Sequence, residues 1–341
     1  MRRAMVTIAA LLTVSDALAQ SGNVPGATAQ PSNEPAAAAL FHAIRVSDVR
    51  AVRGALDEGG SANARSDEGD TPLMYAAVHS TADCMRLLLD RGADPNARDK
   101  RGGTALMRSI RDPDKVRLLL DRGAAVDARS DLGITALMIA SNSPRASDVV
   151  TLLLARKADP RSADAAGIPT LMYATDLGDL ATVTALVAAG ADVKVGRSNL
   201  ATPVFWAANG PLDVLVWLLA HGADPNAARQ RDGMSPLMMA AGAGIVENAR
   251  ALLDGGANVN ATGARGTPLI FAAGSDLAGA DMIRLLLERG ADPNAVVSRC
   301  DLCIHEPRPA DGGRDLTALM LARQRGETEI VRLLIAAGAK R

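Results

Sequence analysis

Apolar residues fall along this chain in short clusters with helical spacing, and polar turn residues separate one cluster from the next. The clearest case is the stretch 69–98. There, Thr71 is placed to cap a helix at its N-terminus, and Pro72 fits the first helical position, where a missing N–H removes no hydrogen bond. Leu73 and Ala76 then begin an apolar stripe at the spacing of one helix face. The pattern predicts a short first helix that starts at Pro72.

A second short helix is predicted over residues 82–90, with Met85 and Leu88 on its apolar face. Gly92 is expected to end this helix in the left-handed conformation, and residues 94–96 (Asp-Pro-Asn) are expected to form a turn. Neither helix is long enough to be stable alone, since isolated helices under roughly 12 residues are marginal in water. The helix–turn–helix unit is therefore expected to stack on copies of itself.

Copies of this unit fill the chain. Each opens with Thr or Ser followed by Pro or Ala and an apolar pair, and each closes with Gly-Ala. Openings begin at Thr104, Thr135, Thr202, Ser235, Thr267 and Thr317. Closing glycines are Gly92, Gly123, Gly190, Gly222, Gly256, Gly290 and Gly338. The spacing is 33 residues from Gly59 to Gly92 and 34 residues from Gly256 to Gly290.

A period of about 33 residues with a Thr-Pro-Leu-x-x-Ala opening resembles the ankyrin repeat. The resemblance covers nearly all of the chain after residue 38. It implies an all-α solenoid of about nine helix–turn–helix units with loop or β-turn fingers. The first unit (39–65) lacks the Thr-Pro-Leu opening, and the last (315–341) stops just after its close. We expect both to be degenerate capping repeats that shield the ends of the stack.

Three features depart from the regular repeat. Pro169 and Thr170 stand in inverted order, so the first turn of that helix is expected to be irregular. Lys157 replaces a closing glycine, which leaves the end of that repeat uncertain in geometry. The last two closing glycines are 48 residues apart, so we place an inserted loop at about 296–314. Insertions in such arrays lie in loops on one face, often the binding face.

The first 19 residues have the three parts of a secretory signal. Arg2 and Arg3 form a basic start, residues 5–14 form a short apolar run, and residues 17–19 (Ala-Leu-Ala) fit the cleavage pattern. The apolar run is too short to span a membrane. The alternative is an apolar N-terminus of a cytosolic protein. We expect an exported protein, periplasmic or secreted, with no membrane insertion after the signal is cleaved.

Residues 20–38 are rich in Pro, Gly, Ser and Ala. Such a composition cannot bury a core, so we expect a disordered linker. The repeat domain is then expected to occupy residues 39–341.

Composition and charge narrow the class of function. The chain is 48% hydrophobic but only 2% aromatic, which suits a thin core between short stacked helices. A formal net charge of −1 gives no broad basic field and argues against a nucleic-acid partner. The sequence has no phosphate-binding loop, zinc-protease helix, nucleophile elbow or dinucleotide fingerprint. We therefore expect a non-enzymatic scaffold without a cofactor that binds a partner protein.

The three cysteines are too few for a disulfide scaffold. Cys84 lies within a predicted second helix and is expected in the core. Cys300, Cys303 and His305 lie in the insertion. We favour a local disulfide between the two cysteines, which suits an exported protein. The alternatives are a redox-active pair without an evident helix N-terminus, a metal site without a fourth local ligand, and a haem attachment site whose histidine comes one residue late. They define a second candidate function, that of a redox-, metal- or haem-associated accessory protein.

One repeat position, two residues after the motif leucine or its equivalent, collects aromatic side chains. We call these residues the ladder: Tyr75, Arg108, Ile139, Tyr173, Trp206, Met239, Phe271 and Leu321. In the family that the chain resembles, this position lies on the first helix, toward the concave groove. Because Trp, Tyr and Arg dominate interface hot spots, the candidate partner contacts are Tyr75, Arg108, Tyr173, Trp206, Met239 and Phe271. The interpretation we favour for these side chains is packing between neighbouring first helices.

Three arginines form a second candidate surface. Arg65, Arg98 and Arg129 each lie six residues after a closing glycine or its equivalent, with an aspartate one or two residues further on. This position predicts a row of basic side chains on the loop tips, where a partner could be bound. The interpretation we favour is local ion pairing on solvated loops.

Overall fold

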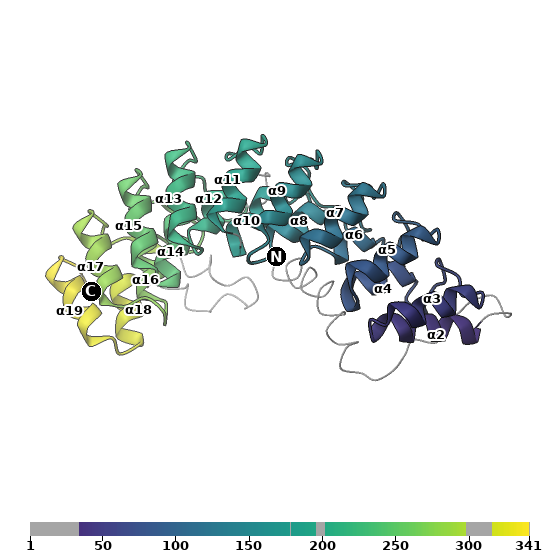
Figure 1. The fold of residues 1–341 in the computed structure, drawn as a ribbon. Helices are drawn as coiled ribbons and strands as arrows, with labels where there is room; N and C mark the ends of the chain where they lie inside the picture. Colours follow the sequence, from purple (N-terminus) through teal and green to yellow (C-terminus); the bar gives the residue numbers. More distant parts are fainter. Residues whose placement is uncertain (1–33, 178, 196–201, 298–315, 341) are drawn as a thin grey trace. The chain divides into compact units, whose positions relative to one another are not determined.

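The computed structural model describes four stretches of the chain, residues 34–177, 179–195, 202–297 and 316–340. Within them the chain forms nine successive pairs of helices, which confirms the predicted all-α repeat fold (Figure 1). The predicted signal peptide lies outside the described residues, and so do Cys300, Cys303 and His305. The disulfide and its alternatives therefore stay predictions.

The chain divides into two compact units, and each is described by itself. Unit 1 comprises residues 1–173 and 184–190, and unit 2 comprises residues 174–183 and 191–341. Helices α10 (Thr170–Leu177) and α11 (Leu180–Ala188) have residues in both units.

The remaining elements each belong to one unit. Those of unit 1 are α2 (Glu34–Arg45), α3 (Val49–Asp57), α4 (Pro72–His79), α5 (Ala82–Asp90), α6 (Ala105–Arg108), α7 (Pro113–Asp121), α8 (Ala136–Ser141) and α9 (Ser147–Ala155). Those of unit 2 are α12 (Pro203–Ala207), α13 (Leu212–Ala220), α14 (Pro236–Ala243), α15 (Val246–Asp254), α16 (Pro268–Ala273), α17 (Ala280–Glu288), β1 (Val296–Val297), β2 (Leu316–Thr317), α18 (Ala318–Gln324) and α19 (Thr328–Ala336). None of the described helices is both long and apolar enough to cross a membrane.

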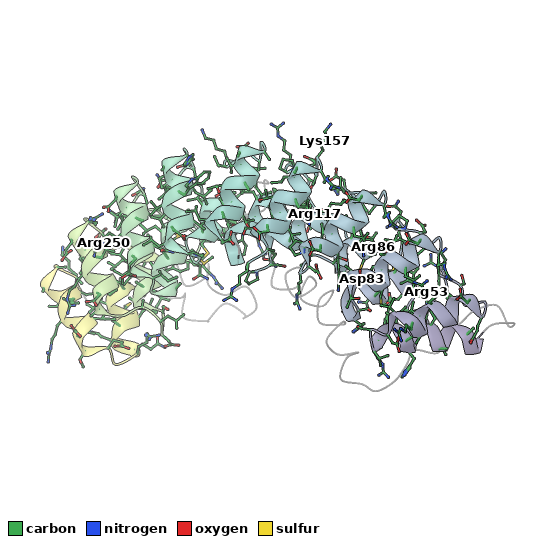
Figure 2. All side chains as sticks on the ribbon, viewed as in Figure 1. Arg53, Asp83, Arg86, Arg117, Lys157 and Arg250 are labelled. Atoms are coloured by element: carbon green, nitrogen blue, oxygen red, sulfur yellow. The ribbon has the colours of Figure 1, made fainter. Side chains whose placement is uncertain are left out.

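Within each unit the helices form two layers. The first helices of successive repeats pack against one another, and the second helices do the same beside them (Figure 1). The core lies between the layers, where Leu73 and Met74 of α4 meet Leu88 of α5, all fully buried. The outer face of α5 is charged, as Figure 2 shows for Asp83 and Arg86, which form an ion pair of 2.5 Å. Each helix therefore buries one face, as the apolar pattern predicts.

The capping residues behave as the sequence predicts. The Thr71 hydroxyl accepts a hydrogen bond of 3.3 Å from the N–H of Met74, and Pro72 opens α4. Gly92 closes the repeat with a φ of 82°, a conformation that side chains with a Cβ avoid. Five further repeats have the same side-chain cap on the first helix, at Thr104, Thr135, Ser235, Thr267 and Thr317.

The two irregular repeats keep their outline by other means. Lys157 takes the left-handed conformation itself, with a φ of 65°. The N–H of Ala158 still donates to the carbonyl of Leu153 at 3.0 Å, so the closing turn is preserved. In the next repeat Thr170 is the first residue of α10, and its hydroxyl donates to the carbonyl of Ser162 at 2.9 Å. The inverted Pro-Thr pair thus ties the start of α10 back to the preceding loop.

The predicted boundary of the linker at residue 38 is wrong. Helix α2 already begins at Glu34, and Ala37 is only 2% exposed. Ala37 packs with Phe41 and Ala64 in a small core cluster. The cause is the run of alanines at 36–39, which are the best helix formers and are small enough to pack.

The inserted loop begins later than predicted. Val296 pairs with Thr317 and Val297 with Leu316 in a two-stranded antiparallel ladder, β1 with β2. Val296 and Val297 therefore belong to the regular loop of that repeat, and the additional residues fall in 298–315, outside the described part of the chain.

Asparagine side chains bind each repeat to the next at the turn that follows the closing glycine. Asn96 donates through Nδ2 to the carbonyl of Gly123 at 2.9 Å and accepts through Oδ1 from the N–H of Ala125 at 2.7 Å. Four other asparagines make the same pair of bonds, namely Asn63, Asn226, Asn260 and Asn294. The amide is suited to this position because it both donates and accepts.

Candidate functional site

The ladder residues share one place on the first helix of each repeat. Most lie four residues after the hydroxyl that caps the helix, for example Tyr75 after Thr71 and Phe271 after Thr267. The cap fixes the start of the helix, and one further turn brings the ladder side chain beside the loop that precedes the helix. We call that loop the finger. Ladder and finger together form the surface predicted from the sequence.

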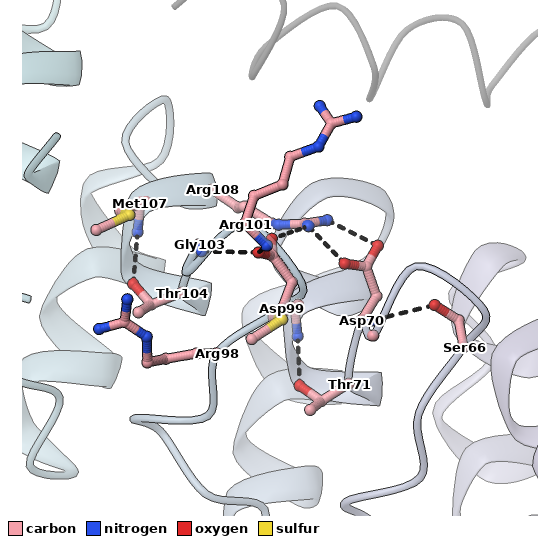
Figure 3. Close-up of polar contacts among 12 residues, drawn as sticks. Ser66, Asp70, Thr71, Arg98, Asp99, Arg101, Gly103, Thr104, Met107 and Arg108 are labelled. Atoms are coloured by element: carbon pink, nitrogen blue, oxygen red, sulfur yellow. Dashed lines mark hydrogen bonds and ion pairs between the residues drawn. The ribbon is translucent and has the colours of Figure 1, made fainter. Parts of the chain in front are cut away.

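Arg108 shows how a ladder side chain and the fingers interact in unit 1. Its guanidinium donates to both carboxylate oxygens of Asp70, at 2.9 and 2.5 Å, and to Asp99 at 2.7 Å (Figure 3). Asp99 lies in the finger of the same repeat, and Asp70 lies in the finger of the repeat before. Arg108 therefore ties two neighbouring fingers together.

The electrostatics of this cluster follow from its burial. The side chains of Asp70 and Asp99 are 8% and 7% exposed. Burial alone would lower the pKa of Arg108, but the negative charge of Asp70 and the hydrogen bond to Asp99 raise it. Burial would likewise raise the pKa of Asp99, but hydrogen bonds from Arg108 and from the N–H groups of Gly103 and Arg101 lower it. Arg108 and Asp99 are thus held in their charged forms.

The cluster removes Arg108 from the candidate partner contacts. Its hydrogen bonds run to two buried carboxylates, so a partner would have to break an internal ion pair to use them. The sequence placed Arg108 correctly in the ladder but could not show that Asp70, 38 residues earlier, would be its partner.

Tyr173 is also an internal residue. Its side chain is 1% exposed, and its hydroxyl donates to Asp164 Oδ2 at 2.7 Å. Burial and the neighbouring carboxylate raise its pKa, so the hydroxyl stays protonated and keeps donating. The prediction that Tyr173 contacts a partner is wrong, because the side chain fills the core. Ile139, at the same position of the preceding repeat, also lies in the core and is 3% exposed.

Tyr75 is half-buried at the edge of an aromatic group. Its ring meets Phe41 edge-on with centroids 5.5 Å apart, and it lies 4.5 Å from the ring of His79. Burial raises the pKa of Tyr75, and burial together with the charge of Arg108 lowers the pKa of His79. Tyr75 thus packs on the first helix of the preceding repeat and leaves only part of its ring for a partner.

The finger arginines mostly brace the fingers. Arg65 donates to the carbonyls of Gly69, at 2.9 Å, and Arg98, at 2.6 Å. Arg129 donates to the carbonyl of Ala163 at 2.8 Å. Both arginines contact the finger of the following repeat, so the side chains are engaged within the fold. They are backbone contacts and not the ion pairs that we favoured.

Ion pairing with a finger aspartate occurs at one of the three arginines. Arg98 lies 3.3 Å from Asp131, and both side chains are more than half exposed. Such an exposed pair contributes little to stability. The three arginines therefore join neighbouring repeats, and their contacts give no support for a binding site.

The ladder of unit 2 is different, because it stays partly exposed and has no finger partner among the residues that the structure describes. Trp206, Met239, Phe271 and Leu321 are all half-buried. The helices of the first three, α12, α14 and α16, contain no charged residue, whereas α18, which carries Leu321, contains Arg323. A Cβ placed on Gly242 would lie 3.5 Å from Cδ1 of Phe271, so this ring leans on the helix before it. The favoured packing between first helices is therefore present, together with an apolar surface that remains open.

The indole N–H of Trp206 lies beneath this surface. Nε1 is shielded from solvent and has no hydrogen-bond partner in the described part of unit 2, so it is not open to a bound chain. No group of three or more His, Cys, Asp or Glu side chains that could hold a metal ion occurs among the described residues.

Comparison with protein families covers most of the chain. A family model described as "Ankyrin repeats (3 copies)" matches residues 13–99, 91–164, 137–229 and 213–297. A second model, described as "Ankyrin repeat", matches residues 314–341. No curated protein matches the chain.

Proposed function

Because the chain belongs to the ankyrin-repeat family, whose repeats generally mediate protein–protein interactions, we propose that it is a non-enzymatic scaffold that binds a partner protein through the ladder of unit 2. The observation that supports this proposal is the half-exposed row Trp206, Met239, Phe271 and Leu321, whose first three members lie on first helices without a charged residue. Interfaces of this kind have an apolar, charge-depleted centre with aromatic and Met side chains.

The ladder of unit 1 is a weaker candidate. Arg108 is held by two carboxylates, and Tyr173 and Ile139 are in the core. Of its ladder residues only Tyr75 offers apolar surface, and part of that ring already packs on Phe41. We therefore assign the partner contact to unit 2.

The test compares two matched sets of variants by which proteins of the native host each set captures. Met239→Asp and Phe271→Asp place a charge on the ladder. Leu212→Asp and Val216→Asp place the same charge on the outer face of α13, where these residues are 41% and 47% exposed. We expect the ladder variants to lose a partner that the wild type and the outer-face variants capture, with all proteins folded by circular dichroism. Equal capture by both sets would contradict the proposal.

We further propose that this binding takes place outside the cytoplasm, in the periplasm or after secretion. The support is the basic, apolar and Ala-Leu-Ala pattern of residues 1–19. Cell fractionation and mass spectrometry of the mature N-terminus test it. A mature chain that begins at Gln20 in the exported fraction is expected, and an uncleaved chain in the cytosol would contradict export.

A further inference from the structure

The finger before α14 carries more positive than negative charge. It holds Arg229, Arg231 and Asp232. Arg229 Nε donates to Asp232 Oδ1 at 2.8 Å, so these two residues neutralise each other. Arg231 is exposed and forms no ion pair within the described part of the chain. One uncompensated positive charge therefore remains on this finger.

The next finger repeats the arrangement. Its one charged residue, Arg265, is exposed and has no carboxylate partner among the described residues. The two finger tips touch, since the N–H of Ala264 donates to the carbonyl of Asp232 at 2.8 Å. Arg231 and Arg265 are thus next to this contact on neighbouring tips, and both belong to the repeats that carry Met239 and Phe271.

Unit 1 is the useful contrast. Its finger and helix segments 65–71, 98–108 and 129–135 hold six basic and five acidic residues. The basic side chains there are largely engaged, as Arg108 is with Asp70 and Asp99. Lys100 and Arg101 are exposed as well, but the ladder side chain that follows them is Arg108, so they do not lie beside an open apolar ladder.

We propose that unit 2 binds an acidic peptide segment with apolar anchors. The apolar side chains of the peptide pack on Met239 and Phe271, and its carboxylates pair with Arg231 and Arg265. This assignment rests on the function proposed above, because it specifies the chemistry of the partner at the same ladder. Complementary charge around an apolar centre selects the partner and speeds its association, and like charge excludes a basic segment.

The charge of the chain separates this partner from a nucleic acid. The ladder alone would also suit a single strand, because its bases stack on aromatic rings and its phosphates pair with arginines. The net charge of −1 disfavours a polyanion that must approach the whole chain. A single-stranded oligonucleotide is therefore a control in the test.

The test uses the whole chain and two labelled synthetic peptides of equal length. Both contain the same Leu, Phe and Trp residues, separated in one peptide by Glu and in the other by Lys. Fluorescence anisotropy at low salt is expected to show binding of the Glu peptide in the micromolar range and its weakening as salt is added. The Lys peptide and a single-stranded oligonucleotide are expected not to bind at the same concentrations.

Matched charge reversals locate the binding. Arg231→Glu with Arg265→Glu is expected to weaken binding of the Glu peptide about tenfold or more, since two rim ion pairs become repulsions. Lys100→Glu with Arg101→Glu makes the same change on an exposed finger of unit 1, where Figure 3 shows Arg101 pointing away from the Arg108 cluster. This control is expected to bind as the wild type does.

Each contrary result has a definite meaning. If the Glu peptide does not bind, if the Lys peptide or the oligonucleotide binds as well, or if both double variants behave alike, the acidic-peptide assignment is overturned. Loss of the natural partner in Met239→Asp but not in Arg231→Glu with Arg265→Glu would overturn this assignment and leave the proposed function standing. Loss in neither would overturn both.

Discussion

At the scale of single residues, the cluster of Arg108, Asp70 and Asp99 is a nearly buried polar contact of unit 1. It brings one guanidinium and two carboxylates out of water, and each group depends on the others for its hydrogen bonds. Removing one member of a buried ion pair destabilises a protein more than replacing the whole pair with apolar side chains, because it leaves a buried charge without a counter-ion.

Arg108→Ala is therefore expected to lower the free energy of unfolding of unit 1 by about 2–4 kcal/mol, because two nearly buried carboxylates lose their counter-ion. Urea unfolding followed by circular dichroism measures the change. Arg111→Ala, at an exposed position three residues on, is the control and is expected to change stability by less than about 0.5 kcal/mol. Equal effects of the two substitutions would show that the cluster adds nothing.

The lowered pKa of Asp99 predicts acid sensitivity. Its pKa in the folded chain is below the value of about 3.9 expected in the unfolded chain, so its contribution is complete above that value and is lost as the pH falls through the folded pKa. We expect the wild type to lose stability below about pH 4, and Asp99→Asn to lose less over the same range. Urea midpoints measured from pH 5 down to pH 2.5 test this, and parallel curves for the two proteins would refute it.

Lys157 gives a prediction of the opposite sign. A lysine with a φ of 65° is strained in a conformation that glycine adopts without cost. Lys157→Gly is expected to raise the free energy of unfolding by about 0.5–1 kcal/mol, since relief of strain exceeds the added freedom of the unfolded chain. Lys157→Ala keeps the strain and is expected to change little. A lower urea midpoint for the glycine variant would contradict the argument.

At the scale of helices and loops, each repeat is joined to its neighbour by side chains that leave one element and end on another. Arg91, Arg122 and Arg156 end second helices, and each pairs with an aspartate of the preceding repeat at 2.7–2.8 Å. The sequence predicts their place at the negative end of the helix but not these partners. Short-range patterns such as caps and turns are readable, whereas a contact across 32 to 35 residues needs the stacking geometry.

Side chains of two second helices also donate hydrogen bonds to carbonyls at the end of the first helix in the preceding repeat. Lys115, the third residue of α7, donates to the carbonyl of Ala77 at 3.1 Å. Asn248, the third residue of α15, donates to the carbonyls of Ala208 at 3.1 Å and Gly210 at 2.9 Å. These short first helices end in carbonyls without a helical partner, which the side chains supply.

Asn248→Val tests this contact with the residue that α13 has at the same position, Val214. Loss of the amide leaves buried carbonyls unsatisfied, so we expect a destabilisation of about 1–3 kcal/mol. Glu247→Ala, at the exposed neighbouring position, is expected to cost less than about 0.5 kcal/mol. A valine variant as stable as the wild type in urea would mean that the carbonyls find other partners.

At the scale of the whole molecule, repeat number, helix order and capping follow from the sequence, because each repeat restates the same local rules. The division into two units does not. It coincides with a change at the position where asparagine binds one repeat to the next elsewhere in the chain. Here that position holds Asp127, Arg161 and Lys194. Arg161 donates to the carbonyl of Gly190 at 2.7 Å, but a guanidinium has no acceptor for the return bond.

The sequence predicted where the candidate surface lies, but not which of its side chains are exposed. Periodicity identified all eight ladder residues, since they repeat with the helices. Burial then separated Tyr173 and Ile139, which are core, from Met239 and Phe271, which stay half-exposed. That distinction depends on neighbouring side chains such as Asp164, which accepts the Tyr173 hydroxyl, and no single repeat contains it as a pattern.

The most direct test of the account is photo-crosslinking in the native host, with a photoreactive amino acid placed at Met239 in one variant and at Val216 in another. Both positions belong to unit 2, one on its ladder and one on the outer face of α13. We predict a specific adduct with another protein from position 239 and none from position 216. An adduct from position 216 alone, or from neither position, would contradict the claim that this chain binds a partner through the ladder of unit 2.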